Sequence, residues 1–127
     1  AAQGGVIGIE AAPHTTITGD HPVHSIESYL EHFEYIRELV GIEHVAFGPD
    51  ALYGDHVGLH DLFSSNMSIE EQTGTSRERI DYVKGLENPT EALDNIIRWL
   101  IKHGYSEKDM ARVVSGNIIR VLEQAWV

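Results

Sequence analysis

Two short apolar runs and one helical repeat dominate the first part of the chain. The run 5–9 is rich in β-branched residues and the run 44–48 ends before a proline, so both predict buried strands. Between them, apolar side chains recur at helical spacing over 25–40, with Ser25 as a candidate N-cap and Gly41 after the last turn. The order strand, helix, strand with short connections predicts a βαβ unit, which requires a parallel sheet covered by helices.

The rest of the chain predicts a long loop followed by helices. Residues 50–85 lack a clear period, and a loop of this length inside a compact domain is usually functional. Helical patterns follow over 89–103, 107–115 and 117–126. Asn88 is a candidate N-cap for the first of these, and Glu91 is placed to reach back to the backbone amide of that cap. Two strands are too few for this many helices, so the pattern predicts part of a larger α/β fold, or a chain that associates with another to complete one.

Composition narrows the class of protein. The 127 residues suffice for one small domain, and acidic residues outnumber Lys and Arg by 20 to 9, for a formal net charge of −11. That balance excludes a nucleic-acid binder, which needs a basic surface. The absence of cysteine excludes disulfides, thiolate metal ligands and a Cys nucleophile. No signal-peptide pattern is present and no apolar run approaches the ~18 residues of a membrane span, so we expect a cytoplasmic location.

Asp50 is the residue best placed for chemistry. It follows the predicted strand 44–48 and opens the long loop, and in parallel α/β folds the reactive groups lie where strands end. A carboxylate there can hold a metal-bound water or carry a proton to a leaving amine. Pro-Asp is also a common turn sequence, so spacing alone slightly favours a turn former.

Histidines supply the other candidate groups. His56 and His60 lie four residues apart, the spacing that places two imidazoles on one helix face for a divalent metal. His14 follows the first predicted strand, so it can line the same rim as Asp50. Each of these histidines also fits a solvated side chain with no ligand role.

Three segments of the second half resemble the end of one enzyme family. They read Tyr82-Val83-Lys84-Gly85-Leu86-Glu87, Gly104-Tyr105-Ser106-Glu107 and Gly116-Asn117-Ile118-Ile119-Arg120-Val121-Leu122. Their order and spacing are similar to those of the membrane dipeptidase (renal dipeptidase) family of zinc metallopeptidases. Upstream, the stretch Gly-Ile-Glu-His-Val-Ala-Phe-Gly-Pro-Asp at 41–50 resembles the family's last barrel strand with its active-site Asp. The resemblance extends over essentially the whole chain.

This resemblance implies a fold and a chemistry. The fold is an amidohydrolase-type (β/α)8 (TIM) barrel, in which this chain supplies the last two parallel strands with their helices. The chemistry is cleavage of a dipeptide by a hydroxide that bridges two zinc ions, whose ligands we expect outside these residues. Asp50 is the functional residue that carries over, and its implied role is to hold the hydroxide and pass its proton to the departing amine. The chain alone is therefore expected to be inactive.

The strand end departs from the family pattern. The family reads Gly-Ser-Asp-Phe-Asp-Gly there, whereas this chain has Gly-Pro-Asp-Ala-Leu-Tyr-Gly at 48–54. The second Asp is missing and the following loop is rich in His, which bears on substrate preference and on activity but not on the fold. We expect His14, Tyr53, His56 and His60 at the rim of the site, with His56 and His60 as candidate metal ligands.

Two other hypotheses fit the same pattern. The chain is alternatively a small non-catalytic subunit or interaction module that completes a barrel with another chain, or a small metal-binding domain built on His56, His60 and an acid. The expected partners are a dipeptide substrate and the remaining barrel segment or a companion chain. Because the open sheet edges and the apolar stripe on 89–103 need covering, the chain is expected to self-associate where that segment is missing.

Overall fold

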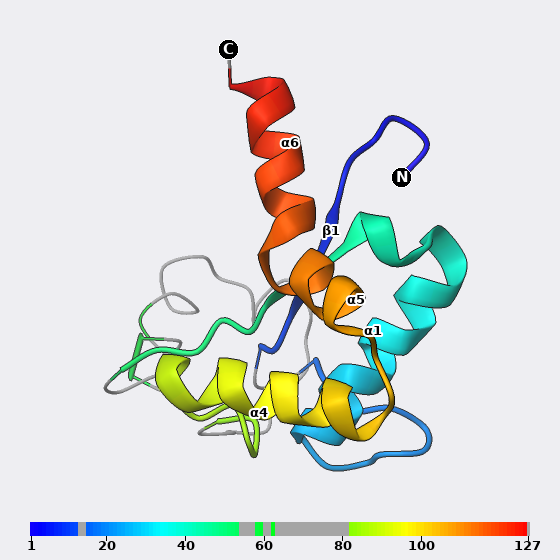
Figure 1. Cartoon of the computed structure of the whole chain (residues 1–127). Helices are drawn as coiled ribbons and strands as arrows, with labels where there is room; N and C mark the ends of the chain where they lie inside the picture. Colours follow the sequence, from blue (N-terminus) through cyan, green and yellow to red (C-terminus); the bar gives the residue numbers. More distant parts are fainter. Residues whose placement is uncertain (13–14, 54–57, 60–61, 63–81, 127) are drawn as a thin grey trace.

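The computed structural model describes residues 1–12, 15–53, 58–59, 62 and 82–126. In this part of the chain the sheet has two strands, β1 (Ile7–Glu10) and β2 (Val45–Gly48), which pair in parallel with Ile7 opposite Val45. The helix α1 (Ile26–Val40) lies between them in the sequence. Figure 1 shows that α1 carries the chain from the end of β1 back toward the start of β2. The expected mixed α/β class with a parallel strand pair is present, whereas the (β/α)8 barrel stays a prediction.

Both strands begin later than their apolar runs predict. β1 starts at Ile7 instead of residue 5, and extends to Glu10. The prediction for His44 was wrong, because it ends a short 3-10 helix, η1 (Ile42–His44), and β2 starts at the next residue. The backbone N–H of His44 explains the difference, because it donates to the carbonyl oxygen of Gly41 at 3.2 Å and closes the 3-10 turn. The imidazole of His44 also ties the two strand entrances together, since its Nδ1 lies 2.8 Å from the carbonyl oxygen of Gly5.

α1 begins and ends where its local signals predict. The Ser25 hydroxyl accepts a hydrogen bond from the Ser28 N–H at 3.4 Å, and the Ser28 hydroxyl accepts one from the Ser25 N–H at 3.0 Å, so each residue caps the other. Gly41 ends the helix with a φ of 87°, a conformation that residues with a side chain rarely adopt. The inner face of α1 buries Tyr29, Leu30 and Phe33 in the core.

The helix α4 (Pro89–Lys102) also starts at its predicted cap, since Asn88 Oδ1 accepts a hydrogen bond from the Glu91 N–H at 3.0 Å. The predicted hydrogen bond from the backbone N–H of Asn88 to the Glu91 side chain is replaced by another. Its carboxylate accepts from the side-chain amide of Asn88 at 3.1 Å instead of from the backbone amide. An Asn cap, unlike a Ser cap, brings an amide donor of its own to the carboxylate. α4 ends one residue before the predicted limit.

The last part of the chain contains two α-helices joined by a π-helix. These are α5 (Glu107–Ala111), η2 (Arg112–Gly116) and α6 (Asn117–Ala125). The single α-helix expected over 107–115 is therefore divided, because the Asn117 N–H bonds the carbonyl of Arg112, five residues back. This wider turn carries Asn117 to the strand entrances.

Asn117 and Arg120 hold the starts of both strands. The buried amide of Asn117 donates to the carbonyl oxygens of Ile42 and Val45, both at 2.7 Å. Arg120 donates to the carbonyl oxygen of Gly4, just ahead of β1, also at 2.7 Å. The segment Gly116–Leu122, noted for its resemblance to a family motif, thus contains the side chains that fasten this end of the sheet.

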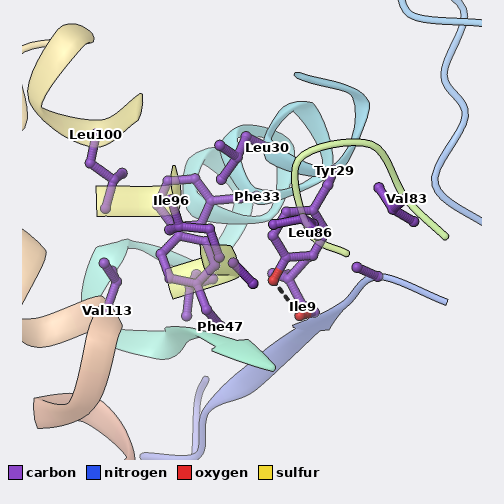
Figure 2. Packing of buried hydrophobic residues seen from close by; sticks show 13 residues of the cluster. Ile9, Tyr29, Leu30, Phe33, Phe47, Val83, Leu86, Ile96, Leu100 and Val113 are labelled. Atoms are coloured by element: carbon purple, nitrogen blue, oxygen red, sulfur yellow. Dashed lines mark hydrogen bonds between the residues drawn. The ribbon is translucent and has the colours of Figure 1, made fainter. Parts of the chain in front are cut away.

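The core lies between α1, the two strands and α4, as Figure 2 shows. The Phe33 ring centroid lies 4.7 Å from that of Phe47 and 5.8 Å from that of Tyr105. Val83 and Leu86, which precede α4, are buried in the same cluster. The end of the long loop is therefore an integral part of the core.

Much apolar surface stays uncovered in the described part of the chain. On α4, Ile96 and Leu100 are buried, whereas Leu93 and Ile101 are 38% and 60% exposed. α6 extends away from the other elements in Figure 1, and Trp126 after it is 82% exposed. No helix among the described residues is long and apolar enough to cross a lipid bilayer. The cytoplasmic location stays a prediction.

Candidate active site

Asp50 lies just beyond the carboxyl end of the sheet, the edge at which β1 and β2 both end. Glu10 and Gly48, the last residues of the strands, are opposite each other, and Asp50 follows Gly48 by two positions. Its side chain is exposed. Its φ is 51°, and among the described residues no other non-glycine residue has a positive φ. Asp tolerates this conformation better than most residues, and such outliers gather at functional sites.

A buried phenol from α1 reaches the carboxyl end of β1. Tyr29 is fully buried, and its hydroxyl donates a hydrogen bond to the carbonyl oxygen of Ile9 at 2.7 Å, the dashed line in Figure 2. Burial raises the pKa of Tyr29 well above its usual value, and the nearby backbone N–H of Gly48 opposes this shift only in part. The phenol is therefore neutral at physiological pH and keeps the proton that it donates to Ile9.

The loop between β1 and α1 is fastened by histidines. Thr16 is buried, and its hydroxyl lies 2.8 Å from His24 Nδ1. The carbonyl oxygen of Thr16 accepts from His32 Nε2 at 3.2 Å, which gives His32 a structural role. These contacts fix the course of the loop that begins at the carboxyl end of β1.

A second contact ties the same loop to α1 through Glu31. The Glu31 carboxylate accepts a hydrogen bond from Thr18 Oγ1 and lies 2.7 Å from His21 Nδ1. The hydrogen bond from His21 and then that from Thr18 lower the pKa of Glu31, against a small opposing effect of burial, and the charges of His21 and His32 lower it slightly further. The ionised carboxylate is therefore the form that holds the loop.

We expect this contact to stabilise the fold above the usual Glu pKa of 4.5 and to be lost as the pH falls through the lower pKa of the folded state. The sign follows because the unfolded chain binds the proton first on acidification. Glu31→Gln should therefore lower Tm at pH 6, and the gap to the wild type should narrow below about pH 4. Thermal melts of both proteins across this range measure it. A gap that is independent of pH would show that the carboxylate charge plays no part.

The long loop returns to the same edge of the sheet from which it leaves. The Lys84 N–H donates to the carbonyl oxygen of His24 at 3.0 Å, and the Lys84 carbonyl accepts from the Ile26 N–H at 2.8 Å. This bridge places residues 82–86 beside the first turn of α1, close to the loop that follows β1. Both described ends of the segment 50–85 therefore border the site.

The remaining predicted rim residues are only partly placed. Tyr53 is 70% exposed, and its hydroxyl contacts the Thr90 hydroxyl in the first turn of α4. His14, His56 and His60 lie outside the described residues. The structure therefore places Asp50 and Tyr53 on the segment that leaves β2 and does not test the other three.

The described residues contain no cluster of three or more His, Cys, Asp or Glu side chains that could hold a metal ion. Zinc in proteins takes at least three such ligands. The described part of the chain therefore does not fit a zinc site of its own, and what it brings to the candidate site is the carboxylate of Asp50.

Comparison with known proteins identifies the family. The family model for the membrane dipeptidases, peptidase family M19, matches residues 1–70, which is more than half of the chain. The chain belongs to the membrane dipeptidase family. The matched residues include β1, α1, β2 and Asp50. No curated protein and no solved structure matches the chain.

Asp50 follows the end of β2, where the resemblance to the membrane dipeptidases expects an active-site Asp. Its catalytic role stays a prediction. The match ends before the three C-terminal segments that first suggested the family. Sequence reasoning missed Tyr29, because this residue also fits the apolar stripe of its helix. One signal could have revealed Tyr29. A tyrosine stands at an apolar position where phenylalanine would fill the same space, and a buried hydroxyl needs a hydrogen-bond partner.

An open groove lies elsewhere on this member of the membrane dipeptidase family. It has a volume of about 360 Å³, between glutamates of α1 and the end of α4. Trp99 and His103 form its far wall, with ring centroids 3.6 Å apart in a stacked arrangement. Asp50 does not line it. The groove is therefore separate from the candidate active site.

Proposed function

We propose that the chain is part of a metal-dependent, dipeptidase-like hydrolase that cleaves the amide bond of a dipeptide with activated water. Membership of the membrane dipeptidase family supports the reaction class. The position of Asp50, beyond the carboxyl end of a parallel sheet and in a strained backbone conformation, is the observation that carries the proposal. The chain would supply two neighbouring strands of a (β/α)8 barrel.

Asp50 would act as the proton carrier of this reaction. Amide hydrolysis needs a base that accepts a proton from the attacking water and an acid that gives one to the departing amine. A single exposed carboxylate at the strand end can do both in turn. The chain's own contribution is thus to hold this carboxylate at the site, while Tyr53 and the loops that follow β1 and β2 would form part of the rim.

Zinc is the metal that family membership suggests. It would polarise the scissile carbonyl and activate the water when bound. Because the described residues form no metal cluster, its ligands would come from elsewhere in the barrel. We use "complete enzyme" for these residues together with the polypeptide that supplies the remaining strands, whether on the same chain or a companion chain. These residues alone would then be inactive.

The test is dipeptide hydrolysis by the complete enzyme with and without metal. We expect 1,10-phenanthroline to abolish hydrolysis and added Zn²⁺ to restore it, with the non-chelating isomer 1,7-phenanthroline as the matched control. Residues 1–127 alone should show neither hydrolysis nor stoichiometric zinc. Hydrolysis that resists chelation would contradict the metal, and a complete barrel with no hydrolytic activity would favour the non-catalytic module.

A further inference from the structure

A second carboxylate ends the strand next to the one that leads to Asp50. Glu10 is the last residue of β1 and is opposite Gly48, the last residue of β2, so the two lie side by side at the carboxyl edge of the sheet. The side chain of Glu10 is exposed, and it has no hydrogen bond or ion pair among the described residues. Contacts within the described part of the chain therefore do not explain a glutamate at this position.

The pleat of β1 decides which way this side chain points. Successive side chains of a strand point to opposite faces of the sheet. Ile9 is buried in the core that the strands form with α1 and α4, so Glu10 points to the face away from that core. In a (β/α)8 barrel the helices cover the outer face of the strands, and the active site opens at their carboxyl ends. Glu10 is therefore aimed toward the proposed site and not toward the helices.

Glycines leave room beside Glu10 on this face. A Cβ added at Gly48 would have only the carbonyl oxygen of Ile9 within 4 Å among the described residues, at 3.9 Å. A Cβ added at Gly8, two residues before Glu10 and on the same face, would have none of the described atoms within 4 Å. Gly48 lies between Glu10 and the segment that carries Asp50, so it puts no side chain into the space between them.

The two carboxylates are within reach of one dipeptide. Neighbouring strands are about 4.8 Å apart. Asp50 follows Gly48 by two positions, and two residues advance a chain by at most about 7 Å. An extended dipeptide also spans about 7 Å. A dipeptide with its scissile amide beside Asp50 can therefore bring one of its ends to Glu10.

We propose that Glu10 binds the N-terminal ammonium of the dipeptide substrate. Of the two charged ends of a dipeptide, a carboxylate attracts the ammonium and repels the other carboxylate. The ammonium nitrogen lies only about 2.5 Å from the carbon of the scissile carbonyl, so an ion pair with Glu10 would hold that carbonyl near Asp50. This inference rests on the proposed function and adds a substrate class, dipeptides with a free amino terminus.

Glu10→Gln in the complete enzyme tests the proposal, with alanyl-alanine and its N-acetyl derivative as the two probes. We expect KM for alanyl-alanine to rise about 10- to 100-fold, the effect of losing a charge-assisted hydrogen bond, with kcat nearly unchanged. For N-acetyl-alanyl-alanine, which has no ammonium, kcat/KM should equal that of the wild type. The preference of the wild type for the free amine should therefore be lost in the variant.

Glu43→Gln is the matched control. Glu43 is an exposed glutamate in η1, at the opposite end of the sheet from Glu10, and its replacement should leave both substrates at wild-type values. A second variant, Glu10→Asp, keeps the charge but shortens the side chain by one methylene group. It should give a KM between those of the wild type and Glu10→Gln and retain the preference for the free amine.

The outcomes distinguish this inference from the proposed function. A wild-type KM for alanyl-alanine in Glu10→Gln would overturn the ammonium site alone, as would an equal loss of kcat/KM on both probes. Loss of zinc from the variant would also overturn it, because Glu10 would then be a metal ligand. A wild-type complete enzyme with no hydrolytic activity would overturn the proposed function, and the ammonium site with it.

Discussion

Asp50→Asn in the complete enzyme should lower kcat for dipeptide hydrolysis by about 100- to 10,000-fold, the range typical of losing a general acid–base group. The amide has the shape of the carboxylate but cannot carry a proton between water and the departing amine. KM should change little, because the proton transfer occurs in the chemical step. Steady-state kinetics over a range of dipeptide concentrations separate the two parameters.

Controls for this variant are straightforward. Asp94→Asn removes an exposed carboxylate from α4 and should leave kcat at the wild-type value. Zinc content and thermal melting of Asp50→Asn should stay close to those of the wild type, since the Asp50 side chain has no hydrogen-bond partner among the described residues. Wild-type turnover in the variant would reduce Asp50 to a turn former with an unusual φ.

Asn117→Ala should have the largest effect on stability, a loss of about 2–4 kcal/mol in the free energy of unfolding, because it leaves one buried and one partly buried carbonyl oxygen without their donor. The amide of Asn117 bonds Ile42 and Val45, both at 2.7 Å, and is buried at the entrance to β2. Urea unfolding of the complete enzyme, compared with the wild type, gives the difference.

The chain offers a matched control in Asn95, which makes one hydrogen bond to the Gly85 carbonyl at 2.9 Å and is only partly buried. Asn95→Ala should cost about 1 kcal/mol, the usual net value of one such bond. Equal losses of stability at the two positions would mean that the two hydrogen bonds of Asn117 contribute no more than the single hydrogen bond of Asn95.

The features predicted well from the sequence depend on neighbouring residues. Ser25 and Asn88 cap their helices because the partners of a cap lie three residues away. The parallel pairing of the two strands follows from the helix between them. Where a residue fits two local structures, the prediction shifted: His44 belongs to an apolar run, but its N–H closes a 3-10 turn with Gly41 and the strand starts one residue later.

Some features of the candidate site could be predicted from the sequence and others could not. The position of Asp50 could be predicted, since it follows from the order of strand and loop together with a family resemblance. Its positive φ could not, because Pro-Asp fits several turn conformations. The hydrogen bond of Tyr29 also escaped prediction, since it joins a helix to the end of a strand that becomes its neighbour only when the chain folds.

The bond from Arg120 to Gly4 has a consequence for the order of folding. It joins residues 116 positions apart, and the bond from Asn117 to Val45 spans 72. Contacts of such long range form late, since the chain must first lose the entropy of closing a large loop. During synthesis, β1 and β2 emerge long before α6, so the bonds from Asn117 and Arg120 are added to the entrance of the sheet only when α6 arrives. A ribosome-bound chain that ends before α6 would therefore fasten this entrance by the contact of His44 with Gly5 and not by the helix.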